Sequence, residues 1–374
     1  MAVLSEEQTM LRDMAREWTK NESPLAAFRK FRGSDDPKGF DAARFDAMAA
    51  MGWAGIIVPE AFGGSDFGWL SLGLVVEETA KTLTPTPLAA SAVAAAALVM
   101  GDSPAMQSAW LPRLASAEAI ATLAIDEGPR HDPQQIATIA VRSGDGWTIS
   151  GTKAFVHEAH GADLFVVAAR DDDGVALFAV PADAPGVTLS TRKLTDSRSH
   201  AEVRMTDVAV SADARIGGPA VFDAVLDRAR IIAAAEMLGM AEHSFAITLD
   251  YLKQRVQFGQ ILATFQALQH RMAALYTRIA LLRSAVEAAL AALDDGIGGG
   301  IGGGGDVPAL ASLAKATAND TLHLVSREVI QLHGGIGMTD EYDIGFYIKR
   351  ARVLENAWGS ASFHRERYAQ MAGY

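Results

Sequence analysis

One segment of the sequence combines residue types that suit a nucleotide-like ligand. In "QLHGGIGMTDEY", residues 331–342, an apolar run with helical spacing ends at Gly334 and Gly335. Glycine often ends a helix because it tolerates the left-handed conformation. It also lets a ligand approach the backbone closely, because it has no Cβ. Gln331 at the start of the segment can both donate and accept hydrogen bonds. The segment could therefore be a helix end, a ligand contact, or both.

A second segment, "YLKQRVQFGQ" at residues 251–260, adds complementary chemistry. Arg255 offers a delocalised cation that suits a phosphate, and Phe258 offers a flat apolar face that suits an aromatic base. A surface cation at a helix end is the simpler interpretation of Arg255 taken alone.

Composition narrows the possible functions. The 374 residues are 49% hydrophobic and include no cysteine, which excludes disulfides, thiolate metal sites and a cysteine nucleophile. We expect no metal site. The net charge of −12 argues against binding to nucleic acid or to an anionic membrane. The most apolar segment, residues 88–100, is far shorter than the roughly 20 residues of a membrane span. We expect a protein without a membrane span, located in the cytoplasm.

The residue pattern changes twice along the chain, which predicts three domains. Residues 1–116 are mainly helical in pattern, and residues 117–215 show short alternating apolar runs with turn residues between them. Residues 216–374 contain three long runs with few helix breakers, at 224–255, 265–293 and 307–332. Long alanine-rich helices joined antiparallel make a bundle. The fold class is therefore α+β.

The glycine-rich stretch "GIGGGIGGGGD", residues 296–306, could suggest a phosphate-binding loop. It lacks the lysine and hydroxyl of such a loop, and no strand precedes it. We interpret it as a flexible link between two helices of the bundle.

Four motifs in this order resemble the acyl-CoA dehydrogenase family. They are "MGWAGIIVPEAFGGSDFGWLSLGLVVEETAK", "GDGWTISGTKAFV", "YLKQRVQFGQILATFQALQHRMA" and "QLHGGIGMTDEYDIGFYIKRAR". The resemblance covers essentially the whole chain. It implies an N-terminal helical domain, a middle β-barrel-like domain, a C-terminal four-helix bundle, and FAD as cofactor.

The resemblance also assigns residues to that cofactor. It implies that one group contacts the adenosine-diphosphate part and serves the cofactor of a neighbouring subunit: Arg255, Gln257, Phe258, Gln331, Gly334 and Gly335. Phe155 stands where the family usually has a tryptophan against the flavin, and His157 replaces the usual hydroxyl. A histidine at a strand end is also common at the surface or as a cap.

The sequence departs from the family at the catalytic base and in one loop. The usual glutamate position, before Gly359, is occupied by Trp358, and the alternative position, before Arg230, is Ala229. An indole and a methyl group cannot accept a proton. Glu236 and Glu355 are nearby carboxylates, although Glu236 could simply pair with an arginine and Glu355 could be solvated. The loop "LAIDEGPRHDP", residues 123–133, lacks the family's Gly-Ser pair but keeps acids.

Three functions follow from the resemblance. The first is α,β-desaturation of an acyl-CoA thioester, with electron-transfer flavoprotein as acceptor. The second is a non-catalytic partner subunit that completes a shared FAD site in a heteromeric dehydrogenase. The third is flavin-dependent oxygenation on the same fold. The resemblance implies a homo- or hetero-oligomer, most simply a dimer of dimers.

Overall fold

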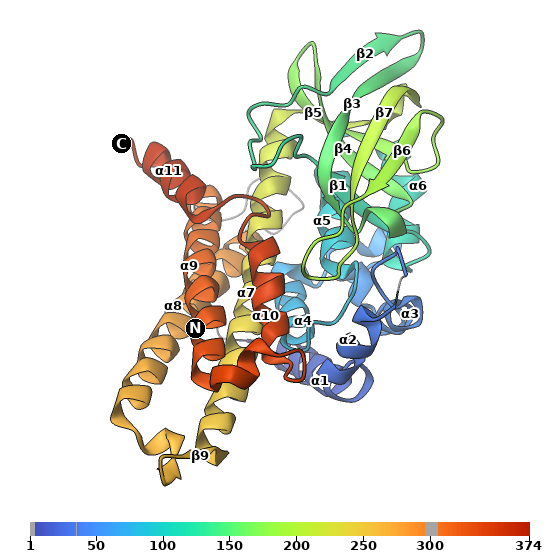
Figure 1. Cartoon of the computed structure of the whole chain (residues 1–374). Helices are drawn as coiled ribbons and strands as arrows, with labels where there is room; N and C mark the ends of the chain where they lie inside the picture. The colour runs from blue at the N-terminus through green and yellow to red at the C-terminus, as the bar shows by residue number, and fades with distance from the viewer. Residues whose placement is uncertain (1–3, 35, 296–305) are drawn as a thin grey trace.

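Helices form the first part of the chain. The computed structural model describes residues 4–34, 36–295 and 306–374 (Figure 1). Ser5 caps the first helix, because its hydroxyl accepts the backbone N–H of Gln8 while the Gln8 side chain accepts the Ser5 N–H. The helices of this part are α1 (Glu6–Glu22), α2 (Leu25–Arg32), α3 (Ala42–Ala50), α4 (Gly68–Lys81), α5 (Leu88–Met100) and α6 (Pro104–Ala115).

A mixed sheet follows the helices. Its strands are β1 (Ala121–Ala124), β2 (Ile139–Ser143), β3 (Gly146–His157), β4 (Leu164–Asp171), β5 (Gly174–Pro181), β6 (Val187–Thr191), β7 (His200–Ser211) and β8 (Arg215–Gly217). Their order is β6-β7-β3-β2-β4-β5-β8, with β1 parallel to β4. The strands β4 and β5 form a hairpin around "DDDG", in register from Leu164↔Pro181 to Asp171↔Gly174.

Strand β4, an interior strand of the sheet, is a continuous apolar run and not an alternating one. Leu164, Val166 and Ala168 belong to the large core shared with the helices. Phe165 and Val167 belong to a second core within the sheet region. Both faces of β4 are therefore buried, as a continuous apolar run requires.

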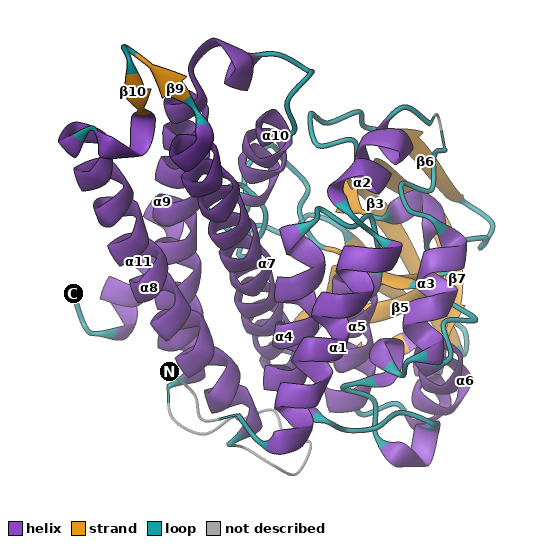
Figure 2. Ribbon diagram, turned by 90° about the horizontal axis from the view of Figure 1, so that it is seen from below, coloured by secondary structure: helices purple, strands orange, loops and turns teal. Residues whose placement is uncertain are grey.

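Long helices form the last part of the chain, beside the sheet in Figure 1. They are α7 (Pro219–Gln254), α8 (Gln266–Asp294), α9 (Val307–His333), α10 (Ile344–Leu354) and α11 (Ala361–Met371), with the hairpin of β9 (Val256–Gln257) and β10 (Gln260–Ile261) between α7 and α8. Helix α7 packs against α4, α8 and α9 (Figure 2). Gly239 permits the close approach to α4, because a Cβ there would lie 2.1 Å from the Glu77 carbonyl oxygen.

The helix–sheet–helix architecture predicted from the sequence is confirmed, with one correction. The sheet path runs from β6 to β8 without closing, so the middle region is an open mixed sheet and not barrel-like. The domain limits at residues 116 and 215 stay predictions, and strand β8 extends the sheet to Gly217. The predicted link at residues 296–305 lies outside the described residues.

Within the described ranges, no helix is both long enough and apolar enough to cross a membrane. The same residues contain no group of three or more His, Asp or Glu side chains arranged to hold a metal ion.

Candidate functional site

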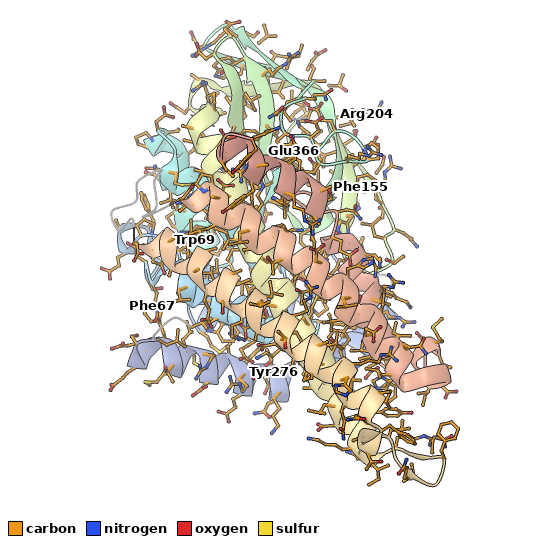
Figure 3. The ribbon with its side chains drawn as sticks, turned by 90° about the vertical axis from the view of Figure 1, so that its left-hand side faces the viewer. Phe67, Trp69, Phe155, Arg204, Tyr276 and Glu366 are labelled. Carbon is orange, nitrogen blue, oxygen red and sulfur yellow. The ribbon has the colours of Figure 1, made fainter. Side chains whose placement is uncertain are left out.

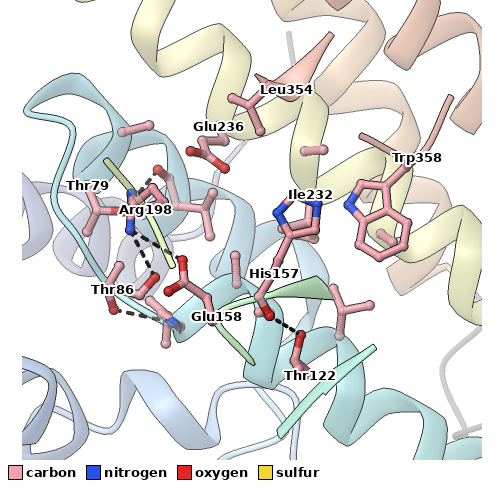
Figure 4. Close-up of a pocket in the computed structure, with 18 of the residues that line it drawn as sticks. Thr79, Thr86, Thr122, His157, Glu158, Arg198, Ile232, Glu236, Leu354 and Trp358 are labelled. Carbon is pink, nitrogen blue, oxygen red and sulfur yellow. Dashed lines mark hydrogen bonds and ion pairs between the residues drawn. The ribbon is translucent and has the colours of Figure 1, made fainter. Parts of the chain in front are cut away.

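An inner cavity lies where the N-terminal helices, the sheet and the C-terminal helices meet (Figure 4). Its volume is about 80 Å³. Helix α7 contributes Ala229 and Glu236 to the wall, and Trp358 comes from the loop after α10. The two positions where the family resemblance places a base, Ala229 and Trp358, therefore line one cavity. Much of the remaining wall is apolar, with contributions from α4, α5 and α7 that include Val76, Leu88, Val93 and Ile232.

A second, outer cavity of about 360 Å³ lies on the other side of His157. It is formed by the loop after β1, the end of β3, the loop before β7 and the end of α10. Several of its side chains are cationic or aromatic: Arg130, His131, Phe155, His157, Lys193, His200 and Arg352. Such a lining suits a ligand that carries both a ring system and negative charge.

Phe155 owes its place at the outer cavity to an irregularity in β3. The pairing of β3 with β7 shifts register between Lys153 and Val156, and Phe155 within this bulge has a φ of +52°. A bulge re-aims a side chain, and positive φ is rare for an aromatic residue. Phe155 stays 40% exposed. An exposed aromatic ring held in a strained backbone at a cavity is a candidate ligand contact.

His157 lines both cavities and separates them. Its Nδ1 lies 3.1 Å from His200 Nε2, and its ring centroid lies 5.6 Å from that of Trp358 at an interplanar angle of 30°. Burial, with nearby cations, lowers the pKa of His157 well below its usual value and that of His200 to about 4. Both imidazoles are therefore neutral at pH 7. His157 is part of the wall between two ligand-sized spaces, not a surface residue or a cap.

The structure places the two carboxylates proposed from the sequence differently. Glu236 lines the inner cavity, and its Oε1 accepts a hydrogen bond of 2.8 Å from Arg350 Nε. Glu355 lines neither cavity; its Oε2 accepts a hydrogen bond of 2.7 Å from Arg352 Nη1. Glu236 thus combines access to the cavity with the arginine pairing that the sequence left open.

A buried charged cluster forms one end of the inner cavity, and sequence reasoning missed most of it. Arg350 also donates to Asp196 Oδ2 at 2.7 Å, so it bridges two carboxylates. Arg198 Nη1 lies 3.7 Å from Glu158 Oε1, as Figure 4 shows. Burial opposes the charge of Arg350, but Glu236 and Asp196 raise its pKa above the usual value. No motif marks these residues, because their partners lie far away in sequence.

The loop that carries Trp358 is held by its backbone. Lys315 Nζ donates to the carbonyls of Leu354 and Gly359, at 3.0 and 3.3 Å, and His364 Nε2 lies 3.0 Å from the Trp358 carbonyl. Trp358 has a φ of +59°, a conformation that costs energy for a bulky side chain. These anchors fix the indole at the inner cavity.

The histidine anchor predicts acid sensitivity. Burial, then Arg230 and Lys315, lower the pKa of His364 from 6.5 to about 2. Below pH 6.5 the His364 imidazole binds a proton in the unfolded chain but not in the folded chain. The free energy of unfolding therefore falls as the pH is lowered. We expect His364→Gln to flatten this dependence between pH 6 and 4 by about 1.4 kcal/mol per pH unit. Denaturant unfolding between pH 6 and 4 measures how the free energy of unfolding depends on pH in the wild type and in His364→Gln. Equal slopes in the two proteins would contradict a lowered pKa of His364.

The acidic loop after β1 is tied to the protein interior. Lys153 is buried and donates to Glu127 Oε1 at 2.6 Å. His131 Nδ1 lies 2.8 Å from Asp126 Oδ1, and Arg230 Nη2 lies 3.3 Å from His131 Nε2. The acids that the sequence analysis noted therefore hold the loop in place, and His131, which the sequence did not single out, reaches the outer cavity.

The remaining cofactor candidates follow the C-terminal ends of α7 and α9. Tyr251, one turn before Arg255, stacks on His333 with ring centroids 4.3 Å apart, and His333 directly precedes Gly334. The structure thus packs the end of α7, just before Arg255, against the end of α9, just before the glycines. This end lies on the order of 40 Å from Ala229, at 1.5 Å per helical residue.

The exposed end of the bundle leaves room for a ligand. Phe258 is 89% exposed and has a φ of +54°. A Cβ at Gly334 or Gly335 would meet nothing within 4 Å, so open space lies in front of both. Gly337 differs, because a Cβ there would lie 2.8 Å from the Ile330 carbonyl oxygen. Two of the three glycines therefore face free space, while the third is a packing requirement.

The two residue sets fit the two ends of FAD. The outer cavity offers an aromatic ring, neutral imidazoles and cations, which suit the flavin end. The exposed end of the bundle offers a cation, a flat ring and two glycines with open space before them, which suit a pyrophosphate and an adenine.

Comparisons with known proteins agree with this geometry. Models of the acyl-CoA dehydrogenase N-terminal, middle and C-terminal domains match residues 5–118, 122–208 and 217–372. The probable acyl-CoA dehydrogenase YngJ of Bacillus subtilis (strain 168) is 30% identical over 97% of each chain.

Solved structures share the whole fold. A variant of the Tcur3481-Tcur3483 steroid ACAD has a TM-score of 0.90 and 32% identity, covering 98% of both chains. The ChsE4-ChsE5 complex from Mycobacterium tuberculosis has a TM-score of 0.91 and 25% identity, covering 100% of this chain and 99% of that one. Proteins of this kind are FAD flavoproteins and oxidoreductases that act on CH–CH bonds. The chain belongs to the acyl-CoA dehydrogenase family.

Proposed function

We propose that the protein acts in FAD-dependent α,β-desaturation of an acyl-CoA thioester. The observation that carries the proposal is the shared wall at His157: an acyl group in the inner cavity would lie beside a flavin in the outer cavity. Bound FAD supplies a hydride acceptor. The chain's own residues supply a largely apolar acyl site and a fixed neutral histidine at the junction.

The cofactor-binding residues are proposed from the two sets already described. Phe155 and His157 would contact the flavin end. Arg255, Gln257, Phe258, Gln331, Gly334 and Gly335 would contact the adenosine-diphosphate end of a cofactor in a neighbouring subunit. The exposed apolar side chains of Tyr276 and Leu281 on α8, 65% and 59% accessible, support association into the dimer of dimers (Figure 3). Electron-transfer flavoprotein is the acceptor we propose.

Glu236 is the carboxylate we propose as the base if this chain is itself catalytic. It lines the inner cavity, whereas Glu355 does not. General base catalysis contributes about 10²–10⁴-fold. We therefore expect Glu236→Gln to lower the rate of acyl-CoA oxidation at least about 100-fold with an artificial electron acceptor. Glu355→Gln is the matched control and should keep the rate. Undiminished activity in Glu236→Gln would exclude Glu236 as the base.

A second candidate is the non-catalytic partner subunit of a heteromeric dehydrogenase. Trp358 and Ala229 both line the inner cavity without offering a base, and its volume is only about 80 Å³. The similar ChsE4-ChsE5 structure is a complex of two chains, which supports this reading. Assaying the purified chain alone, and then with any dehydrogenase-like chain that copurifies with it, separates the two. Activity of the chain alone at an ordinary enzymatic rate would exclude the partner role.

A further inference from the structure

Glu158 is a buried carboxyl group for which the proposed reaction gives no role. It follows His157, lines the inner cavity and is only 5% exposed. Its φ of +54° places it in a left-handed conformation that glutamate rarely adopts. In Figure 4 its side chain lies beside Arg198, on the opposite side of His157 from Trp358. The strained backbone brings a polar group into a largely apolar wall.

The cations near Glu158 are already engaged elsewhere. Arg198 donates to the carbonyl oxygens of Thr84 and Thr86, at 2.7 and 3.4 Å, and approaches Glu158 Oε1 only to 3.7 Å. Arg350 is occupied by Asp196 and Glu236. Glu158 Oε2 is buried and has no hydrogen-bond partner among the described residues. A buried polar atom without a partner is costly, and rotation of the Glu158 carboxyl group toward the cavity that the residue lines would offer this atom to a ligand.

The protonation state of Glu158 decides which ligand atom fits. Burial raises its pKa to about 8, with Asp196 and Glu236 in the same direction, while Arg198 and Arg350 oppose them. His157 and His200 nearby are neutral. At pH 7 most Glu158 carboxyl groups therefore carry a proton and can donate an O–H hydrogen bond from a side chain that faces the cavity.

We infer that the inner cavity selects acyl groups with a keto or hydroxyl oxygen beyond the β carbon, and that Glu158 donates a hydrogen bond to that oxygen. This inference rests on the proposed function, because it places an acyl group in this cavity. A volume of about 80 Å³ holds roughly three non-hydrogen atoms, scaled from a cavity of about 150 Å³ that holds benzene. A C4 carbon, its oxygen and a C5 carbon would fill it, which leaves C2 and C3 at the His157 wall, between this cavity and the outer one.

The test compares pentanoyl-CoA with 4-oxopentanoyl-CoA, which differ only in the oxygen on C4. Anaerobic titration calorimetry with the FAD-loaded protein at pH 7 measures both affinities. We expect the keto ligand to bind about tenfold more tightly, the scale of one net hydrogen bond. In Glu158→Leu the ratio of the two affinities should fall to about one.

The pH dependence provides a second readout that a purely structural role would not change. Above pH 8.5 ionised Glu158 cannot donate, so wild-type protein should lose its preference for the keto ligand. Glu158→Gln donates through its amide at every pH, and it should keep a preference at pH 7 and at pH 9. Circular dichroism and the melting temperature establish that both variants fold.

The outcomes separate this inference from the proposed function. Equal affinities for the two ligands at pH 7 would overturn the inference while leaving acyl-CoA binding established. A preference that survives in Glu158→Leu would overturn the role of Glu158. Failure of both ligands to bind the wild-type protein would overturn the proposed function and the inference together.

Discussion

Replacing Arg350 by methionine lowers the free energy of unfolding by about 3–5 kcal/mol, the cost of removing one partner from a buried ion pair. Arg350 is 8% exposed and bridges Asp196 and Glu236, at 2.7 and 2.8 Å. Without it, two carboxylates from distant segments would lose the cation that hydrogen-bonds both of them. Methionine keeps most of the side-chain volume, so the loss would report charge rather than packing. Denaturant unfolding at pH 7 measures it.

Two further variants make the Arg350 result specific. Arg204 lies on the surface of the sheet region (Figure 3), with a side chain 62% exposed and 3.5 Å from Glu202. Arg204→Ala should cost less than about 1 kcal/mol, as exposed ion pairs do. Adding Asp196→Asn and Glu236→Gln to Arg350→Met should recover part of the stability, because these substitutions remove the two carboxylate charges that Arg350 had paired. A loss in Arg350→Met no larger than in Arg204→Ala would contradict the account of the cluster.

Replacing Arg255 by alanine weakens FAD binding by about 10–100-fold. A hydrogen bond to a charged group contributes about 1.5–3 kcal/mol, which corresponds to this range. The Arg255 guanidinium is exposed and has no side-chain partner among the described residues, so it is available to a phosphate. Fluorescence titration of the FAD-free protein with FAD measures the change.

Lys253→Ala is the matched control for Arg255. Lys253 is an exposed cation in the last turn of α7, two residues before Arg255. If only general positive charge matters, both variants should weaken binding equally. If Arg255 contacts the pyrophosphate, Lys253→Ala should stay within about twofold of wild type. An Arg255→Ala protein that binds FAD as tightly as wild type would remove this end of the bundle from the proposed cofactor site.

The long helices were predictable because their signals are local. The runs predicted at 265–293 and 307–332 correspond to α8 (Gln266–Asp294) and α9 (Val307–His333). Gly334 ends α9 as the glycine pattern indicated, with a φ of +66°. The open sheet was not predicted, because strand order depends on pairing between segments far apart in sequence.

The charged end of the inner cavity was not predictable for the same reason. Arg350 and Asp196 are 154 residues apart in sequence. Glu158 follows β3, whereas Arg198 lies in the loop between β6 and β7. Nothing in the local sequence of "FVHEAH" shows that Glu158 is buried or that one of its oxygens lacks a partner. His157 was found from the family resemblance, whereas its neighbour required the packed structure.

The visible absorption spectrum of the purified, FAD-supplied chain, before and after anaerobic addition of acyl-CoAs, reports flavin binding and acyl-CoA oxidation in one experiment. We expect a flavin band that bleaches with a suitable acyl-CoA, because His157 lines both cavities. Adding Trp358→Ala as a second sample shows whether the indole restricts entry. No flavin band in the FAD-supplied chain would contradict the claim that these cavities form a flavin and acyl site.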